Sequence, residues 1–260
     1  MKRRHLVGLA ALTLQPVWAL PGTPRRIAVA PGPQAEVMDF VADLAARDGL
    51  TLQLQLRADG ERVNAELAAG RLDAASVQDA VSFAQQVMRE QLPLASAAST
   101  LTLPVALYSR RLRVLQQLPD GARIAVPAEP AVGARALLLL HNHGLIELRP
   151  GSGLQATARD VVGNRRRLRL QPLPSVRLVA ALDSAELAVI PRDHAAAAGL
   201  LPARDSLGLE DSRTPYAGVL AVRADQRQQP WVAQLVRSYQ SEPVKRFILA
   251  RYQESVRRPW

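Results

Sequence analysis

The strongest constraint on the fold is the alternation of short apolar segments with amphipathic helical segments along the first third of the chain. The predicted elements are, in order, a strand at 26–30, a helix at 34–47, a strand at 51–56, a helix at 63–69, a strand at 73–77 and a helix at 78–90. In the first helix, apolar residues recur at the spacing of one helical face: Val37, Phe40, Val41 and Leu44. Strands that alternate with helices predict a parallel sheet covered on both faces, and ligands bind such sheets at the carboxyl ends of the strands. The loops after Ala30, Leu56 and Val77 are therefore expected to face a cleft.

A second series of strands and helices follows. It comprises extended runs at 101–108 and 218–222, strands at 124–126 and 188–190, and helices at 230–240 and 243–252. Each of the last two helices has a proline at its start, and Ser241 is a plausible N-cap for the second. The fold class predicted is α/β, with two lobes joined by two extended connections.

Residues 1–19 have the parts of a secretory signal peptide. Lys2, Arg3 and Arg4 precede an apolar core at 6–14, and the sequence VWA at 17–19 is typical of a cleavage site. We expect cleavage before residue 20 and export to the periplasm, because the apolar run is too short to span a bilayer.

The chain contains no cysteine. A disulfide and a lipid-modified N-terminal cysteine are both excluded. We therefore expect a protein without a lipid anchor, free in the periplasm.

The chain is basic, with a formal net charge of +10. Removing the signal peptide leaves 30 basic against 23 acidic residues, a charge of +7, with a cluster at 165–169 (RRRLR). Nucleic acid is not an expected partner, because an exported chain meets little of it and no aromatic residues are interleaved for base stacking. A solvated basic face is the alternative.

The segment 123–148 predicts an anion site at Arg135. A strand at 124–126, a loop at 127–133 and a helix beginning near Ala134 would place Arg135 in the first helical turn. Free backbone N–H groups and the helix dipole favour an anion there, and a guanidinium can hold a carboxylate in a bidentate fork. The alternative is that Arg135 is a solvated surface residue.

Several sequence blocks, taken together in order and spacing, resemble a known family. They are LYSRR at 107–111, LPDG at 118–121, RALLLL at 135–140, GLIEL at 144–148, GLQAT at 153–157 and DSRTPY at 211–216. The chain resembles the methionine-binding lipoproteins, also called the NlpA family, which are substrate-binding components of ABC importers. The resemblance implies a type II periplasmic binding protein with a ligand in the cleft between its lobes. Lobe I would comprise 20–104 plus 217–260, and lobe II 105–216.

The resemblance also suggests ligand-binding positions. Arg135 corresponds to the family arginine that pairs with the amino acid carboxylate. Most other positions depart from the family pattern. An aromatic, Gln, His and Tyr set corresponds to Val77, Gln78, Asp79 and Ser82, a tyrosine corresponds to Gly60, and two asparagines correspond to Pro191 and Gly218.

These departures predict a changed ligand preference. Two lost hydrogen bonds from the asparagines would weaken methionine binding by about 30-fold to 10⁴-fold. Methionine is therefore not expected to be the best ligand, and Asp79 could meet a ligand ammonium or guanidinium.

Three functions remain open on the sequence. The first is a periplasmic protein that delivers an amino acid, methionine or a related small carboxylate, to an ABC permease and ATPase. The second is an orphan or sensory module of the same fold that has lost methionine binding. The third is an enzyme, which no nucleophile, metal or cofactor motif favours, so neither cofactor nor metal is expected.

Overall fold

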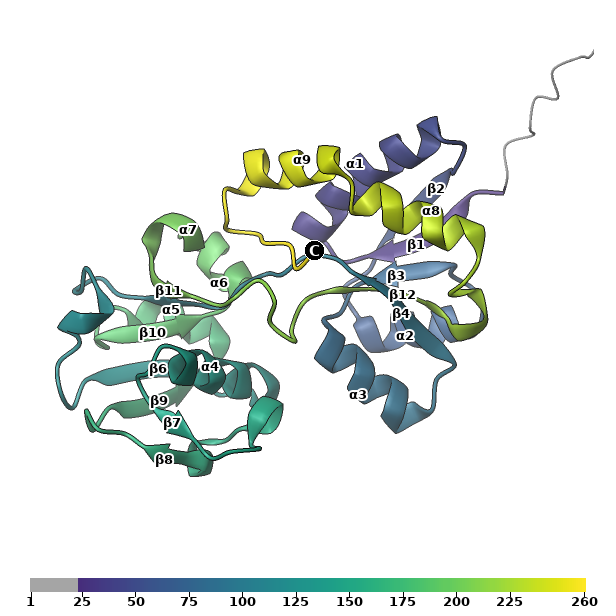
Figure 1. The fold of residues 1–260 in the computed structure, drawn as a ribbon. Coiled ribbons are helices and arrows are strands. Elements are labelled where there is room, and N and C mark those ends of the chain that lie inside the picture. Colours follow the sequence, from purple (N-terminus) through teal and green to yellow (C-terminus); the bar gives the residue numbers. More distant parts are fainter. Residues whose placement is uncertain (1–22) are drawn as a thin grey trace, which may run out of the picture.

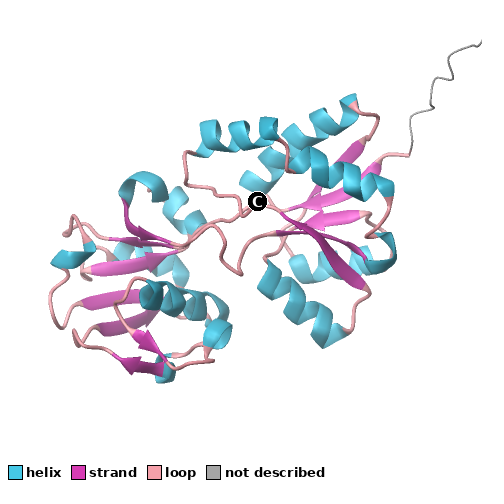
Figure 2. Cartoon of the chain, viewed as in Figure 1, coloured by secondary structure: helices cyan, strands magenta, loops and turns pink. Residues whose placement is uncertain are grey.

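The computed structural model describes residues 23–260, and the predicted signal peptide lies outside them. The molecule consists of two α/β lobes, each built around a five-stranded sheet with helices on both faces (Figures 1 and 2). One sheet takes its strands from residues 25–99 and 219–223, and the other takes its strands from residues 106–209.

The lobe I sheet has the order β2-β1-β3-β12-β4. Its strands are β1 (Arg25–Val29), β2 (Leu52–Leu56), β3 (Ala74–Ser76), β4 (Leu94–Ser99) and β12 (Val219–Arg223). The first three strands are parallel, as predicted, but β12 runs antiparallel to both β3 and β4. The prediction of an all-parallel sheet was wrong here, because β12, a strand from near the end of the chain, lies between β3 and β4.

Helices cover both faces of the lobe I sheet. They are α1 (Pro33–Arg47), α2 (Gly60–Ala68), α3 (Ala80–Glu90), α8 (Pro230–Tyr239) and α9 (Glu242–Tyr252). α1, α8 and α9 share one core with the sheet, and α2 and α3 pack on the other face (Figure 1). Of its predicted apolar stripe, α1 buries Val37 and Val41, while Phe40 and Leu44 are partly buried against the same core.

The lobe II sheet has the order β11-β5-β10-β6-β9. Its elements are β5 (Ala106–Tyr108), β6 (Arg123–Pro127), α4 (Pro130–Asn142), β9 (Arg169–Leu173), α5 (Leu178–Ala181), β10 (Leu187–Ile190), α6 (Arg192–Ala197), α7 (Pro202–Asp205) and β11 (Ser206–Leu209), with a small ribbon of β7 (Glu147–Leu148) and β8 (Val161–Gly163). α4 packs on one face and α5 with α6 on the other. The parallel strands β10, β6 and β9 end on the side that faces lobe I.

The C-terminal tail binds both connections between the lobes (Figure 1). Thr102 in the first connection forms an isolated bridge with Arg257, and Arg257 Nη1 donates to the Glu210 carbonyl in the second connection at 3.0 Å. Trp260 Nε1 donates to the Thr100 carbonyl at 2.8 Å. The junction is therefore held by three chain segments.

One strand was missed by the sequence analysis, and two local predictions differ from the structure. The missed strand, β4, has the sequence LASAAS, which lacks the β-branched and aromatic residues that mark strands. α2 begins at Gly60 rather than Val63, because Asp59 caps it by accepting from Arg62 N at 3.1 Å. Ser241 occupies the N-cap position of α9, but its hydroxyl makes no hydrogen bond to any described residue.

Candidate ligand-binding cleft

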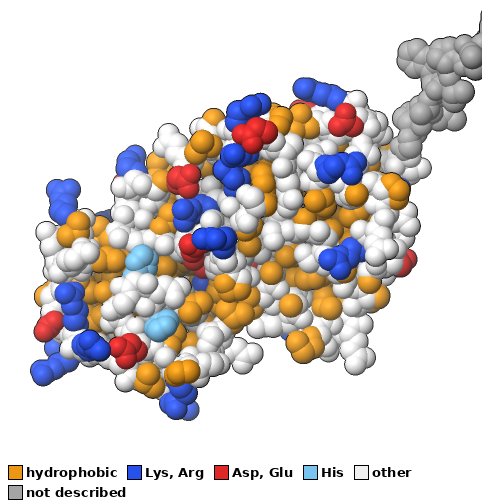
Figure 3. Space-filling model, in the orientation of Figure 1, with side chains coloured by type: hydrophobic (Ala, Val, Ile, Leu, Met, Phe, Trp, Pro, Cys, Tyr) orange, Lys and Arg blue, Asp and Glu red, His pale blue; other side chains and the backbone are white. Residues whose placement is uncertain are grey.

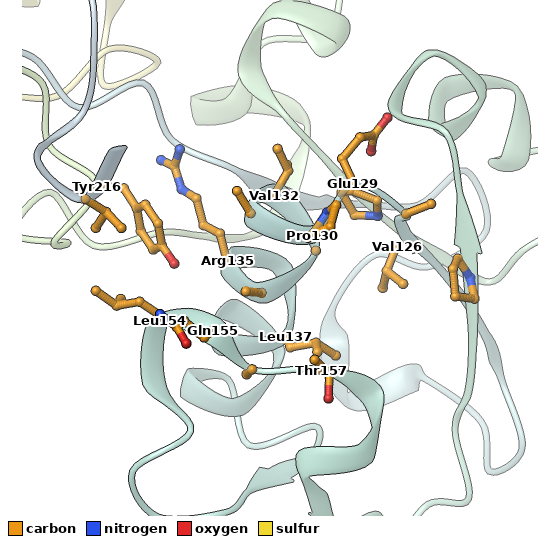
Figure 4. Close-up of a pocket in the computed structure, with 18 of the residues that line it drawn as sticks. Val126, Glu129, Pro130, Val132, Arg135, Leu137, Leu154, Gln155, Thr157 and Tyr216 are labelled. Carbon is orange, nitrogen blue, oxygen red and sulfur yellow. The ribbon is translucent and has the colours of Figure 1, made fainter. Parts of the chain in front are cut away.

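A cavity of about 680 Å³ lies between the two lobes. Lobe I lines it with the start of α3, and lobe II lines it with the end of β6, the first two turns of α4, β9 and the segment 154–158. Tyr216, in the second connection, lies at its edge (Figure 4). Of the three loops expected to face a cleft, the one after β3 lines this cavity, whereas residues after β1 and β2 are not among its described lining.

Asp79 and Ser82 bring the polar start of α3 to the cavity. Asp79 is the N-cap of α3, and its carboxylate accepts from Ser82 N at 3.0 Å and from Ser82 Oγ at 2.9 Å. A carboxylate has about four acceptor sites, so Asp79 can still accept a hydrogen bond from a ligand.

Helix α4 places Arg135 in its second turn, not its first. The helix begins at Pro130, a residue suited to the first helical position, so the predicted start at Ala134 was wrong. The free backbone N–H groups of the first turn therefore lie one turn before Arg135. Arg135 must be judged by its side-chain contacts instead.

Arg135 is held by an internal carboxylate. Its Nε donates to Glu210 Oε1 at 2.8 Å, Nη2 donates to Glu210 Oε2, and Nη2 also donates to the Leu103 carbonyl at 2.8 Å. The side chain is 16% exposed, which rules out a solvated surface position. Within residues 23–260 its Nη1 has no hydrogen-bond partner, so in this arrangement one nitrogen, rather than a bidentate fork, is left for a ligand.

Glu210 is the partner that the sequence did not reveal. Its side chain is 8% exposed and also accepts from Thr214 Oγ1 at 2.9 Å and Val105 N at 3.2 Å. Glu210 directly precedes the block 211–216, but nothing in that block indicates a pair with a residue 75 positions earlier. The pair neutralises much of the Arg135 charge that a ligand carboxylate would meet.

Tyr216 is a second residue that the sequence analysis missed. The Arg135 guanidinium lies 4.9 Å from the centre of its ring, in the geometry of a cation–π contact. The residue is 6% exposed, and its hydroxyl has no hydrogen-bond partner among the described residues. Burial raises the pKa of this hydroxyl, Arg135 opposes the rise, and Asp79 and Glu210 add to it. The hydroxyl is therefore a protonated donor, and Figure 4 shows it directed toward the side of the cavity formed by Leu154 and Gln155.

Gln78, Val77 and Gly60 lie in lobe I outside the cavity lining. Val77 packs against the lobe I core beneath α2 and α3. Gln78 Oε1 accepts from Asn64 Nδ2 at 2.6 Å, and its side chain lies over Gly60, where a Cβ would come within 2.4 Å of Gln78 Cγ. Where the family pattern has a tyrosine, this chain thus has a glycine that makes room for the Gln78 side chain.

Gly218 and Pro191 also lie outside the cavity lining. A Cβ at Gly218 would come within 2.6 Å of Thr100 Oγ1 and 3.1 Å of the Leu101 carbonyl, so an asparagine does not fit there without movement of the first connection. Pro191 is the N-cap of α6 and provides no side-chain hydrogen bond. Of the eight positions proposed from the sequence, Arg135, Asp79 and Ser82 meet at the cavity.

Charged residues do not gather in one large patch on the face drawn in Figure 3, where acidic side chains lie among the basic ones. In the part of the chain that the structure describes, no three His, Asp or Glu side chains come together in a way that could hold a metal ion. Nor does any helix of residues 23–260 have the length and apolar character needed to cross a membrane.

Two α/β lobes with a cavity between them define the class of two-lobed periplasmic substrate-binding proteins, and the predicted fold class is confirmed. The chain belongs to the NlpA lipoprotein family, whose model matches residues 26–260. The resemblance stated from the sequence is thereby also confirmed.

Similar sequences and similar solved structures support this family assignment. The chain is 35% identical to the D-methionine-binding lipoprotein MetQ of Escherichia coli K12, over 84% of this chain and 82% of that one. A nutrient-binding protein from Burkholderia cenocepacia bound to methionine has a TM-score of 0.75 and 36% identity, covering 91% of this chain and 100% of that one. An ABC transporter periplasmic substrate-binding protein from Coxiella burnetii has a TM-score of 0.75 and 33% identity, covering 90% and 99%. The family is one of binding proteins and not of enzymes.

Proposed function

We propose that this protein binds an amino acid in the cavity between its lobes and delivers it to an ABC importer. The observation that carries the proposal is the placement of opposite charges in one cavity. Arg135 comes from lobe II, Asp79 comes from lobe I, and Tyr216, whose hydroxyl has no hydrogen-bond partner among the described residues, lines the same cavity. An α-amino acid presents a carboxylate and an ammonium group close together, which complements this set.

The names of the relatives support an amino acid as the ligand. Of the three similar proteins described above, one is named a D-methionine-binding lipoprotein and another is a nutrient-binding protein bound to methionine. In this chain, however, Gln78 covers the Gly60 position and Gly218 leaves no space for an asparagine. We therefore propose a related amino acid rather than methionine as the preferred ligand.

The partner proposed is an ABC permease with its ATPase, reached from the periplasm. A similar structure is named as the substrate-binding protein of an ABC transporter, which supports this partner.

A second candidate is an orphan or sensory module that no longer binds methionine. The pairing of Arg135 with Glu210 favours it, because an internal carboxylate already occupies two nitrogens of the guanidinium. Such a module would keep the two-lobed fold without a transported ligand.

Mass spectrometry of small molecules released from the purified, denatured protein distinguishes the two candidates. A bound amino acid supports the transport protein. An empty cleft, together with no thermal stabilisation by any amino acid, would contradict it and support the second candidate.

Calorimetry of matched cap variants tests the site itself. Asp79 and Asp59 both cap helices of lobe I, and Asp59 is outside the cavity lining. Asn is also a good N-cap, so Asp79→Asn and Asp59→Asn should keep both helices. Asp79→Asn should weaken amino acid binding at least about tenfold, the value of one charge-assisted hydrogen bond, while Asp59→Asn leaves it unchanged. Equal effects would exclude Asp79 from the site.

A further inference from the structure

The polar groups of the cavity are gathered at one end. Figure 4 shows Arg135 and Tyr216 side by side on the left, with Leu154 and Gln155 next to them and Val126 on the right. Asp79 and Ser82 line the lobe I side. A zwitterionic head group held at this end would direct the remainder of the ligand along the cavity into lobe II.

The wall in lobe II is apolar. It consists of Val126, Leu137, Ala156, Leu170 and Pro172, which are contributed by β6, α4, β9 and the segment 154–158. Val126, Leu137 and Ala156 belong to the buried core of lobe II, so this wall rests on packed elements rather than on a free loop.

The two polar residues along this wall already have partners. The Thr157 hydroxyl donates to Asp160 Oδ2 at 2.8 Å. The Glu129 carboxylate accepts from Ser175 N at 2.9 Å and Ser175 Oγ at 2.8 Å, and Figure 4 shows it directed away from Leu137 and Val126. Neither side chain needs a polar group from a ligand.

The corresponding space in lobe I is closed. Asn64 donates to Gln78 at 2.6 Å and to Gln86 at 2.8 Å, and the Gln78 side chain covers Gly60. An apolar side chain of a ligand therefore finds an apolar surface in lobe II and not at these lobe I positions.

We infer that the ligand is an amino acid whose apolar side chain, either unbranched or bulky, is longer than that of methionine. This side chain lies against the lobe II wall. The inference rests on the proposed function and specifies its substrate class. The cavity volume of about 680 Å³ lies in the range of pockets that enclose drug-sized molecules, whereas methionine has only nine non-hydrogen atoms.

A homologous series of straight-chain 2-amino acids tests the inference by calorimetry, with both enantiomers, from 2-aminobutyrate through norleucine to 2-aminooctanoate. Burial of each added methylene group should raise the affinity about fourfold, so 2-aminooctanoate should bind about 16-fold more tightly than norleucine. A maximum at norleucine, followed by a decline, would overturn the inference and leave the proposed function standing. Failure of the whole series to bind would overturn the inference, and it would overturn the proposed function as well if no amino acid is released from the denatured protein.

Variants of the wall identify where the chain of the ligand lies. Leu170→Gln should weaken the binding of 2-aminooctanoate at least about tenfold and leave the binding of 2-aminobutyrate unchanged. Leu201→Gln, which alters a leucine of lobe II that is 42% exposed and outside the cavity, is the matched control and should change neither. Leu170→Ala, which keeps an apolar residue in the same wall, repeats the test if Leu170→Gln lowers the folding yield. An equal effect on short and long ligands, or no effect from either cavity variant, would contradict contact with this wall.

Discussion

Replacing Glu210 with glutamine tests whether the Arg135–Glu210 pair stabilises the junction of the lobes. Glutamine keeps the shape of glutamate but removes its charge, so Arg135 would keep a positive charge with only the Leu103 carbonyl as a strong acceptor. Because the two side chains are 16% and 8% exposed, that charge would be largely excluded from water.

The expected cost follows from this burial. Removing one partner of a buried ion pair destabilises proteins by about 3–5 kcal/mol. We expect the lower end, about 3 kcal/mol, because Arg135 lines the cavity and its side chain is still 16% exposed. For a chain of this size the melting temperature should fall by roughly 6–12 °C.

A double-mutant cycle with Arg135→Met measures the pair itself by urea unfolding. Once the guanidinium is gone, Glu210→Gln leaves no buried charge, so the double variant should be at least about 2 kcal/mol more stable than the sum of the single effects. Glu61→Gln is the control, because Glu61 pairs with Arg89 on the surface and its side chain is 65% exposed. That change should stay within about 0.5 kcal/mol. Additive effects of the Arg135 and Glu210 changes, to within about 0.5 kcal/mol, would refute the argument.

Three further predictions concern the surroundings of the cleft. Asp79→Ala should cost about 1 kcal/mol by loss of the α3 cap, measured by urea unfolding; an unchanged stability would contradict the capping role. The backbone N–H of Ser175 donates to the Glu129 carboxylate and holds its pKa below the ordinary value of 4.5. The stabilisation of the folded protein by this hydrogen bond is complete above about pH 4.5 and is lost as the pH falls through the lowered pKa. Denaturation at pH 3–6 should therefore show a shallower acid loss in Glu129→Gln, and parallel curves would exclude the effect. Trp260→Ala should lower the melting temperature by several degrees, because the hydrogen bond to the Thr100 carbonyl is lost; differential scanning calorimetry that shows no shift would contradict this.

The periodicity of apolar residues predicted most of the fold, because most of its helices and strands are marked by the residues within them or at their ends. α1 has an apolar stripe and Pro33 at its start, and β1 is a short apolar run. β4 escaped prediction because Ala and Ser form a strand here only through pairing with β12, which lies about 120 residues later in the chain.

The candidate site was less predictable because its chemistry depends on long-range contacts. Arg135 was identified, but its charge partner Glu210 and the aromatic Tyr216 reach it only through folding. Asp79 was expected as a free acidic group, whereas its first role is to cap α3. Neither the spacing of these residues in the sequence nor the composition of the chain indicates these contacts.

The position of β12 sets the order in which the lobes can be completed. β12 separates β4 from β3, so β4 has no neighbour in the sheet until residues 219–223 have left the ribosome. Lobe II is made from one uninterrupted stretch, β5 through β11, and all its strands exist before that moment. The half of the molecule that begins first along the chain is thus the last to close, and a chain truncated before residue 219 would keep an intact second half beside an unfinished first one.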